Sequence, residues 1–377
     1  MVRTGGAGGS GEGHEGGPAR IHGGGPVHID EDASVHSHVD TSADDEQQHS
    51  RGGEPRRAAD LHVPVLLEEC LDMLAPAVQH PGAVLIDATL GMGGHTEGAL
   101  TRFPDLHVVG IDRDPEAIAL ASARLAPFGG RFTAVTTTYD HIDEVAAEHG
   151  SDGLVDGVLM DLGVSSLQLD DGERGFSYSH DAPLDMRMDP TSGISAAELL
   201  ATADEHELTR ILRTYGEERF AQRIARLIVS ERAGTPLTRT SQLADLVRRA
   251  IPAPARRTGG NPSKRTFQAL RVAVNDELHI LEDALPRALA SVRVGGRVVV
   301  ESYQSLEDRI VKAVFREGSR DTTPPGLPVL PDHTDAPLRL LTRGAGRADQ
   351  AELARNPRSA SVRLRGVEII SPWRTRS

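Results

Sequence analysis

The feature of this sequence that most constrains its fold is a regular alternation of short apolar runs with amphipathic segments. The apolar runs have the composition of β-strands, and helix-like segments separate the first four of them. The expected strands are 83–86, 107–111, 131–135, 154–160 and 297–301, and the expected helices are 65–75, 94–103, 115–125 and 140–148. This alternation predicts an α/β fold with a parallel sheet that is covered by helices on both faces.

More than 130 residues separate the fourth expected strand from the fifth, and their patterns are helical. Because a loop of that length is implausible in a compact domain, we interpret the stretch as an inserted helical subdomain. Two later apolar runs, 338–342 and 361–369, are expected to add a β-hairpin at the sheet edge. The expected division is a first part of the core at 61–169, the helical insert at 170–272 and a second part of the core at 273–377.

Residues 1–60 are rich in Gly, His, Asp and Glu and carry hardly any large apolar side chains. Such a segment cannot bury enough apolar surface to offset its ordering entropy, so we expect it to be disordered. Its irregularly spaced histidines are more typical of a solvated tail than of a metal site. The chain shows neither the apolar core of a signal peptide nor the roughly 20 apolar residues of a membrane span. We therefore expect a cytoplasmic protein that is not in a membrane and needs no metal.

A glycine-rich turn, "DATLGMGGHT" (residues 87–96), directly follows the first expected strand. Gly91, Gly93 and Gly94 would let a ligand approach the main chain at the carboxyl end of that strand, where ligands lie in doubly wound sheets. Asp112 comes 21 residues after Gly91, at the end of the second expected strand, where an acid accepts hydrogen bonds from a ribose. The turn and the acid together predict a site for a nucleoside-type cofactor.

The turn has an acid-first pattern, D-x-x-x-G-x-G-G, which begins at Asp87. A nicotinamide site instead has G-x-G-x-x-G and brings a helix N-terminus to a pyrophosphate. The acid-first form suits S-adenosylmethionine, which has no phosphate and whose ammonium group gains from a nearby carboxylate. Asp87 either binds that ammonium or braces the turn. His95 either faces the ligand, which we favour, or packs at the helix N-terminus, and a purely structural turn is the remaining alternative.

Residues 160–189 begin at the same edge of the sheet, and Asp161 ends the fourth strand. Methyltransferases that act on amino groups need acceptors there, because an exocyclic amine is a poor nucleophile that must be held in line with the sulfonium methyl. We interpret Asp161 as such a positioning acceptor and not as a strong base. Phe176 and Tyr178 are candidate stacking partners for an unstacked base, with a core role as the alternative.

The distribution of charge indicates the class of substrate, and the single cysteine indicates the mechanism. The formal net charge is −14, yet the run from Arg223 to Arg271 holds 11 Lys or Arg residues and 2 acids, which favours a polyanion-binding surface over a merely solvated face. The one cysteine, Cys70, excludes an internal disulfide. It stands on an apolar helical face, which favours core packing over attack on a pyrimidine ring. Direct transfer to an amine is therefore the better mechanism.

Eight segments stand in order along the chain: "HVPVLLEE" (62–69), "IDATLGMGGHT" (86–96), "GIDRDPEAI" (110–118), "DLGVSSLQLD" (161–170), "RGFSY" (174–178), "LDMRMD" (184–189), "SKRTFQALRVAVNDEL" (263–278) and "SLEDRIVK" (305–312). Together with "NPRSASVRLR" (356–365), they resemble the small-subunit ribosomal RNA cytosine-N(4) methyltransferase family, also called methyltransferase H or MraW. Residues 1–60 lie outside the resemblance.

The resemblance implies a Rossmann-like class I S-adenosylmethionine-dependent methyltransferase fold with an inserted helical subdomain. It also implies methylation of the N(4) amine of a cytidine in the decoding centre of 16S ribosomal RNA, within an assembled or late-assembly 30S particle, with free RNA left open as a substrate. Asp112 would bind the ribose hydroxyls and Tyr139 the adenine side. The cofactor contacts that carry over are Gly94, His95, Thr96, Asp112, Tyr139, Asp161 and Gln168. The candidate substrate contacts are Phe176, Tyr178, Lys264 and Arg265.

The chain departs from the family pattern at Leu167, where the family usually has Pro, and at Tyr303 and Gln304, which replace Phe and His. Whether a role of that imidazole persists at position 304 is open. A DNA amino-methyltransferase is the nearest rival, but it usually carries D/N-P-P-Y/F after the fourth strand, where this chain has "DLGV". A non-catalytic cofactor-binding or ribosome-assembly factor is a second rival, which only an activity test separates. A nicotinamide oxidoreductase is disfavoured by the turn pattern.

Overall fold

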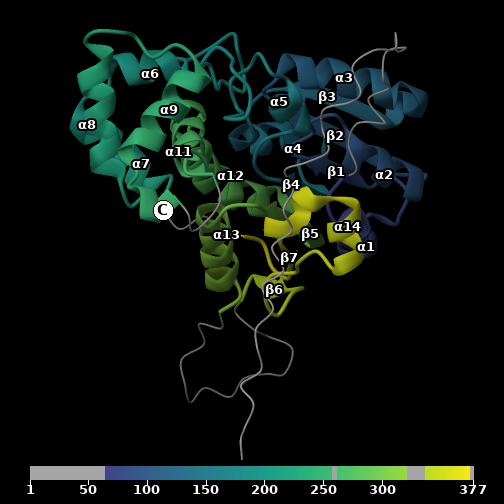
Figure 1. Cartoon of the computed structure of the whole chain (residues 1–377). Coiled ribbons are helices and arrows are strands. Elements are labelled where there is room, and N and C mark those ends of the chain that lie inside the picture. The colour runs from purple at the N-terminus through teal and green to yellow at the C-terminus, as the bar shows by residue number, and fades with distance from the viewer. Residues whose placement is uncertain (1–63, 257–260, 321–335, 374–377) are drawn as a thin grey trace, which may run out of the picture. The chain divides into compact units, whose positions relative to one another are not determined.

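The computed structural model describes residues 64–256, 261–320 and 336–373. The expectation of disorder for residues 1–60 lies outside these ranges. Within them, seven strands form one sheet in the order β3-β2-β1-β4-β5-β7-β6 (Figure 1). The strands are β1 (Val84–Asp87), β2 (His107–Asp112), β3 (Phe132–Thr136), β4 (Val155–Asp161), β5 (Val292–Ser302), β6 (Leu338–Leu340) and β7 (Arg363–Ile369).

The first five strands run parallel, and the order reverses between β1 and β4. All five strands expected from the sequence are present. β5 begins earlier than expected because Val292 also pairs with Val155, across an irregularity in the register. The expected hairpin is present as well: β7 runs antiparallel to β5, and β6 pairs antiparallel with β7 at the sheet edge. This strand order and the surrounding helices confirm the Rossmann-like α/β class of a class I methyltransferase.

Helices cover both faces of the sheet because alternate side chains of each strand point to opposite sides. Leu85 packs with the buried residues of one face, whereas Val84 and Ile86 pack with those of the other. The first face is covered by α1 (Leu67–Val78), α2 (Gly94–Arg102) and α3 (Pro115–Leu125), and the second by α4 (Ile142–His149), α12 (Glu277–Ser291) and α13 (Ser305–Gly318). The strands are therefore buried on both sides, as their nearly continuous apolar runs predict.

The stretch between β4 and β5 forms helices that share a hydrophobic core of their own, and these helices gather together in Figure 1. Ser195 caps α6 (Ala196–Thr202) and forms a capping box with Glu198, and Asp204 caps α7 (Glu205–Thr214). α11 continues past the expected boundary at residue 272 and ends at Asn275. The helices are α6 (Ala196–Thr202), α7 (Glu205–Thr214), α8 (Ala221–Arg232), α9 (Thr240–Ala250), α10 (Ala253–Arg256) and α11 (Lys264–Asn275).

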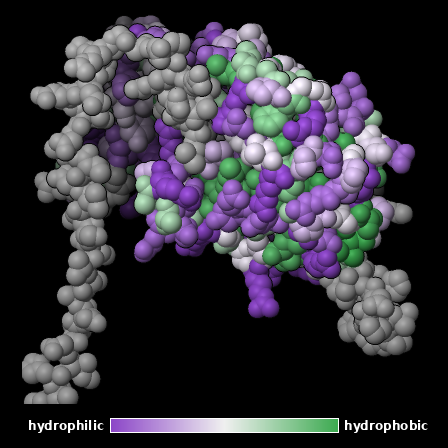
Figure 2. Space-filling model, turned by 90° about the vertical axis from the view of Figure 1, so that its right-hand side faces the viewer, coloured by the Kyte–Doolittle hydropathy of each residue, from purple (hydrophilic) through white to green (hydrophobic). Residues whose placement is uncertain are grey.

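The remaining helices are short: α5 (Ser166–Asp170), α14 (Gln350–Arg355) and the 3-10 turns η2 (Ala126–Arg131), η3 (Tyr139–His141) and η4 (Pro357–Ser361). Across the described ranges, no helix has the length and apolar character that a membrane span requires. On the face shown in Figure 2, hydrophilic side chains predominate and hydrophobic ones are interspersed among them.

Candidate active site

A cavity of about 510 Å³ opens at the carboxyl ends of β1, β2 and β4. Residues of the sheet edge line it together with residues of the helical insert. Of the expected site residues, the cavity brings together Gly94, His95, Asp112, Tyr139, Asp161, Gln168, Phe176, Tyr178 and Lys264. Thr96 and Arg265 are not part of this lining.

The glycine turn has the backbone geometry that its composition indicates. Gly91 has a φ of +50° and Gly93 a φ of +77°, both in the left-handed region that favours glycine. Gly93 is also crowded, since a Cβ there would lie 3.0 Å from Cδ1 of Leu125. The turn therefore brings bare main chain to the cavity wall and starts α2 directly behind it.

Asp112 is joined to this turn by its carboxylate. One oxygen accepts a hydrogen bond from the backbone N–H of Gly91 at 2.8 Å, and the other accepts from the N–H of Asp114 at 2.9 Å. Burial raises the pKa of Asp112 to about 6, although both hydrogen bonds oppose the increase. A carboxylate oxygen can accept two hydrogen bonds, so Asp112 keeps capacity for ribose hydroxyls.

Asp87 is buried beneath the turn and does not line the cavity. Its carboxylate accepts from the Thr96 hydroxyl at 2.7 Å and from the backbone N–H of Thr89 at 3.3 Å. These contacts correspond to the bracing role, one of the two that the sequence left open. Thr96 is fully engaged with this brace, which explains why it lies behind the cavity wall.

Asp161 ends β4 with its side chain 22% exposed at the cavity. The Tyr303 hydroxyl donates to Oδ1 of Asp161 at 2.8 Å, and the backbone N–H of Asp161 donates to the Thr89 hydroxyl oxygen at 2.6 Å. The imidazole of His95 lies alongside, with Nδ1 3.7 Å from Oδ2 of Asp161. Asp161 is therefore held by a donor that directly follows β5, and it lines the cavity together with the turn and the insert.

Gln168 lines the cavity and belongs to a hydrogen-bonded network with Asp114. It forms a capping box with Ser165, and its Nε2 donates to Asp114 at 3.2 Å. The same Asp114 oxygen accepts from Arg174 at 2.6 Å. Asp114 is fully buried and also caps α3. One carboxylate thus fastens the "RGFSY" segment to the end of β2.

The two aromatic candidates lie on the insert side of the cavity. Phe176 is buried in the insert core and lines the cavity as well, so both of the roles weighed for it are compatible with its position. Tyr178 makes an edge-to-face contact with Phe267, with ring centroids 5.8 Å apart. Lys264 is exposed at the mouth, whereas Arg265 reaches away to the carbonyl of Glu217 at 3.4 Å.

Among the charged cavity residues that the sequence analysis did not single out, Arg271, Glu277 and Glu307 interact with one another. Arg271 and Glu277 form a bidentate ion pair with two 2.8 Å contacts. Glu307 accepts from the backbone N–H groups of Tyr303 and Gln304, and burial raises its pKa to about 7. All three lie in quoted motifs, but local sequence gives no sign that they meet. Tyr139 lines the same region, and its hydroxyl lies 3.5 Å from the Glu277 carbonyl oxygen.

The family model described as "MraW methylase family" matches residues 59–370. The chain belongs to the MraW methylase family. Among curated proteins, "Ribosomal RNA small subunit methyltransferase H" of Beutenbergia cavernae is 61% identical over 320 residues, which are 85% of this chain and 96% of that one. The protein of the same description from Mycolicibacterium smegmatis is 60% identical over 82% of this chain and 84% of that one.

A solved structure of an rRNA methylase from Streptococcus thermophilus aligns with 82% of this chain and 99% of that one, at 11% identity and a TM-score of 0.37. The fold assignment for this MraW methylase rests on its strand order and family. Family membership confirms S-adenosylmethionine as the cofactor. The residues that line the cavity suit this cofactor. Asp112 has free acceptor capacity for a diol, the glycine turn offers bare main chain, and the carboxylates of the lining would favour a cationic sulfonium.

Proposed function

We propose that this MraW methylase transfers a methyl group from S-adenosylmethionine to the N(4) amine of a cytidine in the decoding centre of 16S ribosomal RNA. Two supports come from outside the cavity: the curated relatives are described as small-subunit ribosomal RNA methyltransferases, and the motif resemblance points to a cytosine amine. The observation that carries the proposal is the position of Asp161. Its side chain is held by Tyr303 and shares one cavity with the glycine turn and the aromatic side chains of the insert.

The position of each cavity residue gives it a role in the proposed reaction. When bound, S-adenosylmethionine supplies an electrophilic methyl on a sulfonium. Asp112 and Gly94 would hold it on the sheet side, with Tyr139 and the region around Gln168 next to it. Asp161 would accept a hydrogen bond from the amine and hold its lone pair toward the methyl group, while Tyr303 keeps the carboxylate from turning. Phe176 and Tyr178 would contact the face of the target base.

The proposed substrate is RNA in an assembled or late-assembly small subunit, and the proposed location is the cytoplasm. The acidic chain has exposed cations in the helical insert: Lys264 at the start of α11, which lines the cavity, Arg223 on α8 and Arg256 on α10. Within the described ranges, none of these three forms an ion pair with an acid. By contrast, Arg226, Arg239, Arg248 and Arg249 of the same basic run are paired with Glu205, Asp181, Asp245 and Glu231.

The test is methyl transfer from labelled S-adenosylmethionine to small ribosomal subunits that lack their own cytosine-N(4) methylation. Free 16S RNA and DNA are run alongside, and the modified nucleoside is identified by mass spectrometry. N(4)-methylcytidine at one position is the expected result, and Asp161→Ala should abolish most of it. Cofactor binding without transfer to any substrate would favour a ribosome-assembly factor, and transfer to DNA would show that the RNA assignment is wrong.

A further inference from the structure

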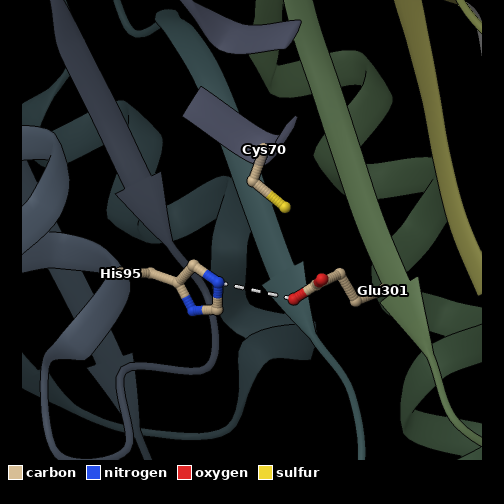
Figure 3. A group of neighbouring side chains, drawn as sticks. All are labelled: Cys70, His95 and Glu301. Carbon is tan, nitrogen blue, oxygen red and sulfur yellow. Dashed lines mark ion pairs between the residues drawn. The ribbon is translucent and has the colours of Figure 1, made fainter. Parts of the chain in front are cut away.

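A buried glutamate lies directly behind the catalytic edge of the cavity. Glu301, on β5, has 0% of its surface exposed and does not line the cavity. Neither of its carboxyl oxygens has a hydrogen-bond partner of good geometry among the described residues. Figure 3 shows the side chain directed toward Cys70 from α1 and His95 from α2. Donor atoms of these three residues lie within 4.8 Å of one another.

The groups that face Glu301 come from every neighbouring element and are mostly acidic. His95 Nε2 lies 3.5 Å from Oε2 of Glu301, and the other ring nitrogen faces Asp161 from β4. The Cys70 thiol contacts Glu301 from α1, where Glu69 adds a more distant negative charge. Tyr303, which follows β5, donates to Asp161. Asp87, on β1, adds a further carboxyl to the same buried region.

The position of His95 indicates a proton store and not a metal site. Nε2 of His95 lies 3.0 Å from the carbonyl oxygen of Val65. Because a carbonyl oxygen only accepts, Nε2 must carry its hydrogen, and a protonated ring nitrogen cannot bind a metal. Burial also raises the pKa of the Cys70 thiol well above its ordinary value, which keeps it in the neutral form.

The charges in this region do not balance if every acid is ionised. One imidazole faces three carboxyl groups, those of Asp87, Asp161 and Glu301, in a region closed to solvent apart from the cavity. A fully buried, ionised carboxylate that lacks a hydrogen bond of good geometry is the most costly member of such a group. Glu301 meets that description, and burial together with the negative charge of Asp161 raises its pKa well above the ordinary range. Glu301 therefore carries a proton when the cavity holds no cation.

We propose that Glu301 stores a proton behind the cofactor cavity and releases it when a cation occupies that cavity. The inference rests on the proposed function. A positive charge beside Asp161 favours ionisation of the carboxyl behind it, so the O–H bond of Glu301 breaks and the proton leaves to solvent. S-adenosylmethionine and S-adenosylhomocysteine differ in this respect, because only the first carries a sulfonium charge.

Proton storage by Glu301 also matches the proton balance of methyl transfer. As the carbon–sulfur bond breaks and the carbon–nitrogen bond forms, the positive charge passes from sulfur to the amine. The amine then loses one N–H proton, and the ionised carboxyl group behind Asp161 gains an O–H bond. The cavity thus returns to its starting charge with a neutral thioether in place of the sulfonium.

The test is isothermal titration calorimetry with S-adenosylmethionine and, separately, S-adenosylhomocysteine, in buffers of different ionisation enthalpy at pH 7.5. The wild-type protein should release up to about one proton more with the sulfonium compound than with the thioether. Glu301→Gln, which keeps the shape of the side chain, should lose most of that difference. Glu218→Gln is the matched control, because Glu218 is 5% exposed, lies in the insert and does not line the cavity.

Equal proton release with the two compounds in the wild-type protein would overturn the proposal, as would a difference that Glu301→Gln leaves unchanged. Infrared spectra give a second readout: the wild-type protein should show a protonated-carboxyl band that Glu301→Gln lacks. Stoichiometric metal in the purified protein by elemental analysis would also overturn the proposal. Failure of the proposed function would look different, since methyl transfer to the small subunit would be absent while proton release on cofactor binding could still be measured.

Discussion

The backbone N–H of Gly91 donates a hydrogen bond to the carboxylate of Asp112 at 2.8 Å. This contact joins the turn after β1 to the acid that ends β2, so the glycine turn and the acid hold each other in place. Asp112 therefore supports the turn, and under the proposed function its remaining acceptor capacity would bind the ribose diol.

Replacing Asp112 with Ala should weaken S-adenosylmethionine binding by ~1–3 kcal/mol, the usual range for lost hydrogen bonds that involve a charged group. Calorimetry at pH 8, where the wild-type carboxyl is ionised, is the measurement. Glu116→Ala is a suitable control, since Glu116 is exposed and its side chain lies outside the cavity lining. Unchanged affinity in the Asp112 variant would show that the ribose assignment is wrong.

The pH dependence of cofactor binding should report the same carboxyl. Burial raises its pKa from 3.8 to about 6 in the folded protein, so the folded state holds this proton between about pH 4 and 6 while the unfolded state has lost it. Stability from this group therefore falls as the pH rises through that window, and the ionised acceptor is complete only above about pH 6. Affinity should drop below pH 6, by at most about tenfold per pH unit. Asp112→Asn should lack this dependence, and a variant that kept it would assign the titration to another group.

Gly93→Ala should destabilise the fold by more than Gly82→Ala. Both positions have a left-handed φ, +77° and +75°, and an alanine there costs ~1–2 kcal/mol. Only at Gly93 would the new Cβ meet a neighbour, Leu125, at 3.0 Å. Denaturant unfolding and cofactor titration of the two variants check this. Equal unfolding free energies with unchanged cofactor affinity would argue against a constrained turn.

Tyr303→Phe removes the hydroxyl that holds Asp161 and leaves the ring in place. Loss of a hydrogen bond to a charged group is worth ~1.5–3 kcal/mol, so kcat for methyl transfer should fall roughly tenfold to a hundredfold. KM for the cofactor should change little, because Tyr303 acts through Asp161. A rise in that KM with kcat unchanged would place Tyr303 in binding and not in positioning.

Lys264→Ala should weaken binding to small-subunit RNA and reduce the slope of log affinity against log salt by ~1, as expected for one lost phosphate contact. Arg248→Ala is the matched control, because Arg248 is also exposed but is paired with Asp245 at 3.0 Å. Filter binding over a range of salt concentrations gives the slopes. Equal slopes in both variants would remove Lys264 from the RNA contact surface.

Local periodicity was enough to predict the sheet and the edge at which the cavity opens. Apolar runs report strands that are buried on both faces, and a glycine turn followed by an acid reports the edge where the strand order reverses. The outer hairpin was also predicted, since β6 and β7 are separate apolar runs near the end of the chain. The roles assigned to single cavity residues, and the domain boundaries, stay predictions.

Contacts between distant segments could not be predicted in this way. Cys70 looked like an ordinary core residue on an apolar helical face, and it is fully buried. Its neighbour Glu301, however, comes from a strand more than 200 residues away and stands in an apolar run that gives no sign of a charged contact. The Arg271–Glu277 pair was missed for a related reason: the helix break at Asp276, with a φ of +52°, turns the two side chains toward each other.

The carboxylate of Asp114 connects three separate segments of the chain. It caps α3, accepts a hydrogen bond from Gln168 on α5 and accepts another from Arg174 in the segment that carries Phe176. A displacement of the aromatic segment is therefore transmitted to the residue two positions after Asp112. Under the proposed function, binding of RNA against Phe176 and binding of S-adenosylmethionine at Asp112 should consequently be thermodynamically linked. Each ligand should change the affinity of the protein for the other by the same factor.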